Sequence, residues 1–90
     1  MKKVSELEKE ITEKHQTIVL TREYYEYLLD WMKEAEKMIA EEHRIEEPTE
    51  FFGLKMVIVP QREIVGRDYK LMREPATLIE MTYNDAEVIR

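Results

Sequence analysis

Few residues of this chain have the types and spacing that catalysis requires. Ser5 is the only serine and cysteine is absent, so a nucleophile paired with a histidine base has almost no candidates. The two histidines, His15 and His43, are far apart, and only His43 with Glu46 or Glu47 suggests even a weak surface metal site. With two glycines, the chain also lacks a glycine-rich phosphate loop. We therefore predict a protein that is not an enzyme, with no cofactor and no metal.

Carboxylates are abundant, and they gather in the first half of the chain. Acids outnumber Lys and Arg through Glu50 and balance them from Phe51 onward, so the first half carries the whole net charge of −6. Such a charge opposes phosphate backbones and favours a partner with a basic surface. An alternative interpretation is a solubilising surface. The candidate partner-binding residues are Glu23, Glu26, Tyr27, Asp30, Trp31, Glu34 and Glu41.

The sequence also contains one cluster of basic residues. It contains an aromatic residue, as nucleic-acid-binding hairpins often do, but acids interleave with its bases. A DNA-binding regulator using this predicted hairpin is therefore an alternative function, although we do not expect nucleic acid as the main partner. The basic hairpin residues are Arg62, Arg67, Tyr69, Lys70 and Arg73.

The candidate partner-binding residues need an element to carry them, and the spacing over 21–45 predicts a long amphipathic helix. Its apolar residues recur three and four apart, which places them on one side of a helix. Thr21 has the side chain of an N-cap, and Leu20 and Tyr25 have hydrophobic-staple spacing. The apolar band is Tyr24, Tyr25, Leu28, Leu29, Trp31, Met32, Ala35, Met38, Ile39 and Ile45. Because it is too wide for so small a core, we expect a homodimer.

The remaining segments predict one α+β domain with a small antiparallel sheet of three to four strands. Ser5 and Glu8 have capping-box spacing for a short helix. Alternating apolar residues predict a hairpin of 54–59 with 68–74, followed by a third strand over 77–83. Residues 1–90 thus divide into a short helix, a strand, the long helix, a linker, antiparallel strands and a tail, at 5–15, 17–20, 21–45, 46–52, 53–83 and 84–90.

The segments Ile18–Leu29, Phe52–Pro60 and Tyr69–Met72 together resemble an arrangement found in small tailed-phage proteins. Those proteins have a strand, a helix and then a Phe-Gly entry into a strand hairpin, and phage capsid-type domains contain a similar piece. The resemblance covers about half of the chain and includes no catalytic residue to transfer. It implies a viral or mobile-element origin and a role in the virion or in host takeover.

These observations lead to one expected function and its alternatives. We expect a non-enzymatic protein, cytoplasmic in a bacterial host, that binds and inhibits a nucleic-acid-handling protein through its acidic helical face. The carboxylates of that face would imitate phosphates. A structural or assembly component of a phage virion is the main alternative. No apolar run approaches the roughly 20 residues that cross a bilayer, so we expect no membrane association.

Overall fold

The computed structural model describes residues 1–36 and 50–89, and its sheet is built around β1 (Thr17–Leu20). All four residues of β1 are buried, as expected for a β-branched, apolar strand with neighbours on both sides. β1 pairs in parallel with β3 (Leu54–Ile58) and antiparallel with β4 (Tyr69–Met72). The predicted strand over 17–20 is therefore confirmed, and it occupies the centre of the sheet rather than an edge.

The helix α2 (Arg22–Glu36) follows β1 directly and begins where the sequence predicts. The backbone N–H of Tyr24 donates to Thr21 Oγ1 at 3.2 Å, which confirms Thr21 as the N-cap. Leu20 and Tyr25 are both buried beside this cap, at the hydrophobic-staple spacing. The last part of the predicted helix, residues 37–45, lies outside the described residues.

The hairpin at the start of β3 corrects the predicted linker over 46–52. Glu50–Phe51 forms the strand β2, which pairs antiparallel with β3 through a two-residue turn. Phe52 and Gly53 form this turn, and both have positive φ, at 49° and 82°. Phe51 is buried in the core, so the segment is structural where a linker was expected. The rest of the predicted linker, 46–49, lies outside the described residues.

The position of β4 contradicts the predicted hairpin of 54–59 with 68–74. Within the described residues the strand order is β2-β3-β1-β4, and β1 lies between the two strands that were expected to pair. A parallel pair needs a long crossover, and α2 lies on the connection between β1 and β3. The sheet is therefore mixed, where an antiparallel one was predicted.

The C-terminal third corrects two further predictions. Ala76–Thr82 forms the helix α3 where a strand over 77–83 was expected, and Glu87–Val88 forms the strand β5 inside the predicted tail. β5 pairs antiparallel with β3. A single turn of 3₁₀ helix, η2 (Gln61–Glu63), lies between β3 and β4. The alternation over 77–83 was misleading, because Ile79 is buried and Ala76 and Tyr83 are half-buried at helical spacing.

The N-terminal helix α1 (Val4–Glu10) is shorter than the predicted 5–15 and is not capped by Ser5. Its N-cap is Lys3, which makes no side-chain capping bond, so the expected capping box does not form. Val4 and Leu7, three residues apart on one side of this helix, are buried. Packing of these two side chains therefore holds the helix, since seven residues are too few for stability in isolation.

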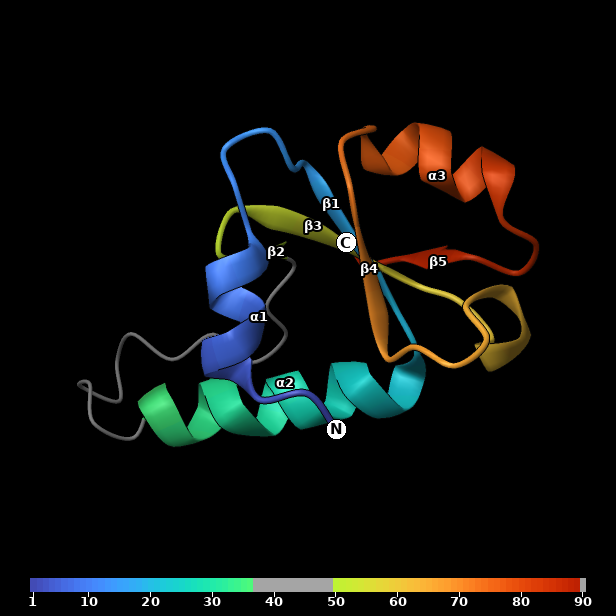
Figure 1. Ribbon diagram of the computed structural model, residues 1–90. Coiled ribbons are helices and arrows are strands. Elements are labelled where there is room, and N and C mark those ends of the chain that lie inside the picture. Colours follow the sequence, from blue (N-terminus) through green and yellow to red (C-terminus); the bar gives the residue numbers. More distant parts are fainter. Residues whose placement is uncertain (37–49, 90) are drawn as a thin grey trace.

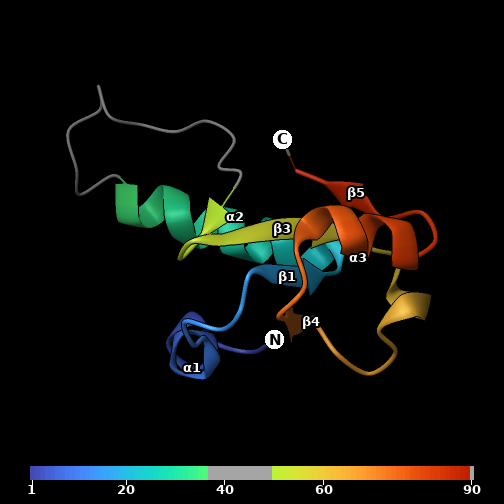
Figure 2. The ribbon, with the colours of Figure 1, turned by 90° about the horizontal axis from the view of Figure 1, so that it is seen from above.

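The fold class is α+β, with helices on both faces of the sheet (Figures 1 and 2). α1 and α2 cover one face, where a large core cluster lies; α3 covers the other, where a smaller one lies. The large cluster contains Val4, Leu7, Ile18, Leu20, Tyr24, Tyr25, Leu28, Phe51, Leu54, Met56 and Ile58. The smaller cluster contains Val19, Val57, Val59, Ile64 and Ile79. β3 therefore contributes buried side chains to both faces of the sheet.

Candidate functional site

The β2–β3 turn and α2 bring three aromatic side chains together at one end of the molecule. The ring centres of Trp31 and Phe52 are 6.3 Å apart, and Trp31 lies equally far from Phe51. Phe51 is buried and contacts Phe52 edge to face at 4.6 Å. Trp31 and Phe52 are 40% and 49% exposed, so each presents half of a large apolar surface to solvent. We call Trp31 and Phe52 the aromatic pair.

Phe52 is held in a backbone conformation that disfavours phenylalanine. Two-residue turns with positive φ at both positions prefer Asn-Gly or Asp-Gly, because a larger side chain clashes with its own backbone. Such a residue in the left-handed region costs roughly 1 kcal/mol or more. The contacts of Phe52 with Phe51 and Trp31 offset part of this cost, yet about half of the ring stays exposed, and strained positions cluster at functional sites.

The acidic side of α2 adjoins the aromatic pair. The side chains of Glu23, Glu26, Asp30 and Glu34 are exposed, and we call these four residues the acidic face. Glu34 neighbours Trp31 on the helix surface, because it lies three residues after it. Glu41, predicted for the same face, lies outside the described residues.

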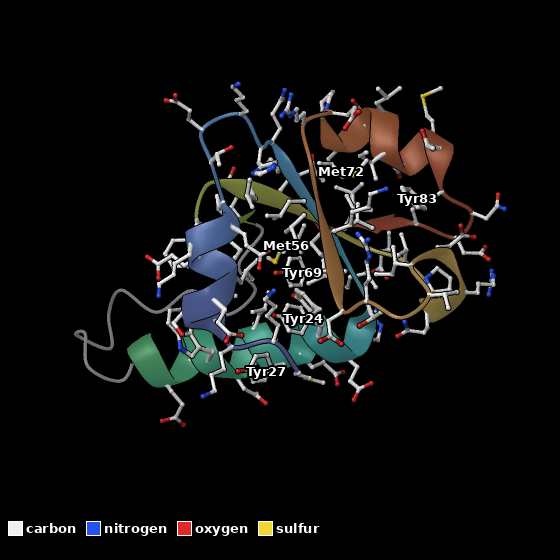
Figure 3. The ribbon with its side chains drawn as sticks, in the orientation of Figure 1. Tyr24, Tyr27, Met56, Tyr69, Met72 and Tyr83 are labelled. Carbon is white, nitrogen blue, oxygen red and sulfur yellow. The ribbon has the colours of Figure 1, made fainter. Side chains whose placement is uncertain are left out.

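Tyr27 is half-buried, unlike the other predicted partner-binding residues that the structure describes. Its ring lies 5.5 Å from that of Tyr24, which is fully buried and stacks in turn on Tyr69 at 5.4 Å. Figure 3 shows these three tyrosines between β4 and α2. Tyr27 therefore extends a core stack to the surface and offers less area to a partner than Trp31 does.

The predicted basic hairpin does not exist as a hairpin, and its residues are distributed over three segments. Arg62 belongs to η2 and forms ion pairs with Asp85 and Glu63. Arg67 lies in the following loop, Tyr69 and Lys70 belong to β4, and Arg73 comes just after it. The side chains of Arg67, Lys70 and Arg73 form no ion pair with another described residue.

Sequence reasoning missed a hollow of about 710 Å³ beside β4. Residues 66–71 line one wall, and Lys2, Glu10 and His15 line the other. Glu10 and Tyr69 are 59 positions apart, and no local sequence signal indicates that they meet. The periodicity of a strand could have placed Tyr69 and Leu71 on one face, but not the N-terminal segment opposite them.

One carboxylate organises the hydrogen bonds of this hollow. Glu10 Oε2 accepts from Lys2 Nζ at 2.8 Å and from the hydroxyl of Tyr69 at 2.5 Å. These two donors hold the pKa of Glu10 below its ordinary value, and the same bond raises the pKa of Lys2. Burial, followed by the bond to Glu10, raises the pKa of Tyr69. Glu10 thus stays ionised and Tyr69 protonated near neutral pH.

The N-terminal segment is fastened to the same place. The hydroxyl of Tyr24 donates to the backbone carbonyl of Lys2 at 2.9 Å, and the backbone N–H of Lys2 donates to Asp68 Oδ2 at 3.3 Å. Burial raises the pKa of Tyr24 above that of an ordinary phenol. Both carboxylates of the hollow, Glu10 and Asp68, are therefore already engaged by groups of the N-terminal segment.

The histidine and metal candidates give no site in the described part of the chain. Nδ1 of His15 accepts from the backbone N–H of Thr12 at 3.0 Å, so this imidazole closes a local turn. Among residues 1–36 and 50–89, no three His, Asp or Glu side chains are grouped as metal ligands. His43, Glu46 and Glu47 lie outside these ranges.

Comparison with known proteins supplies no relative from which a role could be transferred. No protein-family model matches the chain, and neither a curated protein nor a solved structure matches it. The resemblance to tailed-phage proteins therefore stays a prediction. None of the described helices is long and apolar enough to cross a membrane.

Proposed function

We propose that this chain is a non-enzymatic interaction protein that binds a partner with a basic surface through the aromatic pair and the acidic face. The observation that supports this most directly is the exposed contact between Trp31 and Phe52. Large aromatic side chains are enriched at interfaces, where they act as central anchors. Phe52 contributes half of this surface from a turn position that favours Asn, at a cost in stability.

Charge defines the kind of partner. The acidic face lies beside the aromatic pair and would meet Lys and Arg side chains, as a polar rim does around an apolar anchor. A host nucleic-acid-handling protein offers such a surface in its nucleic-acid channel, and the chain would inhibit it by occupying that channel. Association would be steered by charge and would slow as salt rises.

The alternative functions predict a different dependence of binding on salt concentration. A virion component would pack through a large apolar interface with little salt dependence. A DNA-binding regulator would need clustered cations, whereas Arg62 is paired with acids of its own chain and Asp68 lies beside Arg67 in the same hollow. We find no specific observation that favours either alternative, and both remain outcomes of the experiment below.

The test begins with capture from a bacterial lysate at low and then high salt, followed by identification and purification of the captured protein. Its affinity is then measured by titration against wild type and Phe52→Asn. Asn suits the left-handed turn position, so folding should be preserved. We expect affinity to fall about thirtyfold, the loss typical of an interface hot spot. The matched control is Val65→Asn, which replaces a 78% exposed apolar side chain elsewhere and should leave affinity unchanged.

A charge experiment completes the test. The triple variant Glu26→Gln, Asp30→Asn and Glu34→Gln should slow association at low salt and change stability by no more than about 0.5 kcal/mol. The control triple Glu6→Gln, Glu8→Gln and Glu13→Gln makes the same change in net charge at exposed positions near α1. The proposal would be overturned if the two triple variants bound the partner equally well, or if Phe52→Asn bound it as tightly as wild type.

The predicted homodimer offers a second occupant for the aromatic pair. Two copies would have to bring their acidic faces together, which like-charge repulsion opposes at low salt. Dimerisation through this surface should therefore strengthen as salt rises, opposite to binding of a basic partner. Light scattering across a salt series would show a mass above 10.9 kDa in that case. A monomer at every salt concentration would remove the dimer prediction and leave the basic partner.

A further inference from the structure

The outer edge of β4 offers backbone groups that no described strand uses. β4 ends the strand order, with β1 as its neighbour. The carbonyls of Asp68 and Met72 accept from the N–H groups of Thr21 and Gln16, at 3.1 and 2.9 Å, and so point toward β1. Backbone directions alternate along an antiparallel strand, so the N–H and C=O groups of Tyr69 and Leu71 point away from the sheet. Such an edge is a template for another strand.

The hollow lies along this edge. Residues 66–71 all line it, although the side chain of Lys70 is on the opposite face of the sheet from those of Tyr69 and Leu71. Because six consecutive residues, 66–71, line the hollow, it follows the course of the chain into β4. Figure 2 shows β4 at the margin of the sheet, on the side where the N-terminus lies. Lys2, Glu10 and His15 form the far wall.

The charge of the hollow is positive in effect. Arg67 and Lys70 line it, and neither forms an ion pair with another described residue. Of the acids that line it, Glu10 is paired with Lys2. The Asp68 carboxylate accepts, among the described residues, only the Lys2 backbone N–H and keeps its charge, so Arg67 and Lys70 still outnumber it. Arg73 adds a further cation just past the end of β4.

We propose that the hollow beside β4 binds an acidic peptide segment in extended conformation, which adds to the sheet as a new edge strand. The peptide backbone would exchange hydrogen bonds with Tyr69 and Leu71, and its carboxylates would pair with Arg67 and Lys70. Main-chain bonds supply affinity in this mode of recognition, while side chains supply specificity. The site is separate from the aromatic pair, so its failure would leave the proposed function untouched.

Two other occupants fit the edge less well. A phosphodiester backbone carries acceptors but no matching N–H groups, so it would leave the outward carbonyls of Tyr69 and Leu71 unsatisfied. A second copy pairing through its own β4 would bring Arg67, Lys70 and Arg73 of two chains together, and like charges across strands are destabilising.

The experiment titrates the ¹⁵N-labelled protein with a nine-residue peptide of alternating Val and Glu, capped at both ends. We expect hydrogen exchange of the Tyr69 and Leu71 amides to slow at least about tenfold on binding, since these N–H groups become hydrogen-bonded. A peptide of the same sequence with N-methylated amides along one edge should bind about tenfold more weakly, because that edge can no longer donate. Exchange that is unchanged with bound peptide, or equal binding of both peptides, would overturn strand addition.

Charge variants test the rest of the proposal. The double variant Arg67→Gln and Lys70→Gln should weaken peptide binding about tenfold, whereas the matched double variant Lys33→Gln and Lys55→Gln should not. All four side chains are exposed, so folding should persist. If an oligothymidylate of nine nucleotides binds more tightly than the peptide, the edge would be assigned to nucleic acid. If, without peptide, hydrogen exchange of the Tyr69 and Leu71 amides becomes slower as protein concentration rises, the edge would be assigned to a second copy. Either result would overturn the proposal.

Discussion

The face of the sheet under α1 and α2 is packed with aromatic and long aliphatic side chains, whereas the face under α3 is packed mainly with valines. Tyr24, Phe51, Leu28 and Met56 are fully or almost fully buried on the first face. Val19, Val57 and Val59 line the second, where Ile79 is the buried residue of α3. Both faces belong to one sheet, yet they bury side chains of very different size.

This difference shows where stability and accessibility lie. Buried apolar area is the main source of stability, so the α1/α2 face should contribute most of it. α3 has only seven residues and leaves Leu78 and Met81 exposed on its outer side. It therefore depends on a single buried anchor and should detach more easily than α2.

The largest expected effect comes from truncating one buried side chain on each face. Leu28→Ala should reduce the free energy of unfolding by about 3 to 5 kcal/mol, because Leu28 is fully buried among large neighbours. Ile79→Ala should cost about 2 to 3 kcal/mol, since the half-buried residues around it can relax into the space. Urea denaturation of both variants measures this. An Ile79→Ala loss equal to that of Leu28→Ala would show that the two faces contribute equally.

Alkaline pH should affect the α1/α2 face selectively, because Tyr24 and Tyr69 lie there. Their pKa values are raised above 10.0 in the folded chain, chiefly by burial. The folded state therefore keeps protons that the unfolded state loses, so stability is complete below pH 10 and falls as pH rises above it. Ultraviolet titration should show these two phenols ionising only as the chain unfolds. Ionisation of all five tyrosines near pH 10 without unfolding would contradict this.

The two helices of the same face differ in how they begin, which gives a smaller effect. Thr21→Ala removes the side-chain cap of α2 and should cost about 1 kcal/mol. Ser5→Ala removes no capping bond, because the N-cap of α1 is Lys3 and makes no side-chain bond, and the loss should stay within about 0.5 kcal/mol. Thermal unfolding of both variants makes the comparison. Equal losses would mean that Ser5 caps α1 in solution.

The smallest expected effect concerns the ion pair that joins the N-terminal segment to α1. The pKa of Glu10 is lowered, so its contribution is present above its ordinary pKa of 4.5 and is lost as pH falls through the lowered value. Because Glu10 is 44% exposed and screened by solvent, Glu10→Gln should cost less than about 0.5 kcal/mol at neutral pH and nothing in strong acid. Denaturation of wild type and Glu10→Gln at neutral pH and in strong acid tests the direction of this effect. A larger loss in acid would contradict it.

Local patterns predicted the elements that depend on nearby residues. β1 follows from β-branched side chains, the start of α2 follows from Thr21 and the apolar spacing after it, and β3 follows from alternation. Trp31 and the acids of α2 were correctly placed on one helix, since helical periodicity is a property of the chain itself. The same periodicity predicts that the acids are exposed, whereas Trp31 was placed in the apolar band and is nevertheless 40% exposed.

Tertiary structure decided what local patterns left open. β4 pairs with β1 and not with β3, and Glu10 meets Tyr69, because strand pairing joins segments that carry no short-range signal for one another. Residues 77–83 read equally well as an alternating strand or as a helix with Ile79 inward. The uncovered valine face needed a helix to bury it, and that requirement settled the choice. The β4 edge and its hollow arise in the same way, since an edge exists only once the strand order is known.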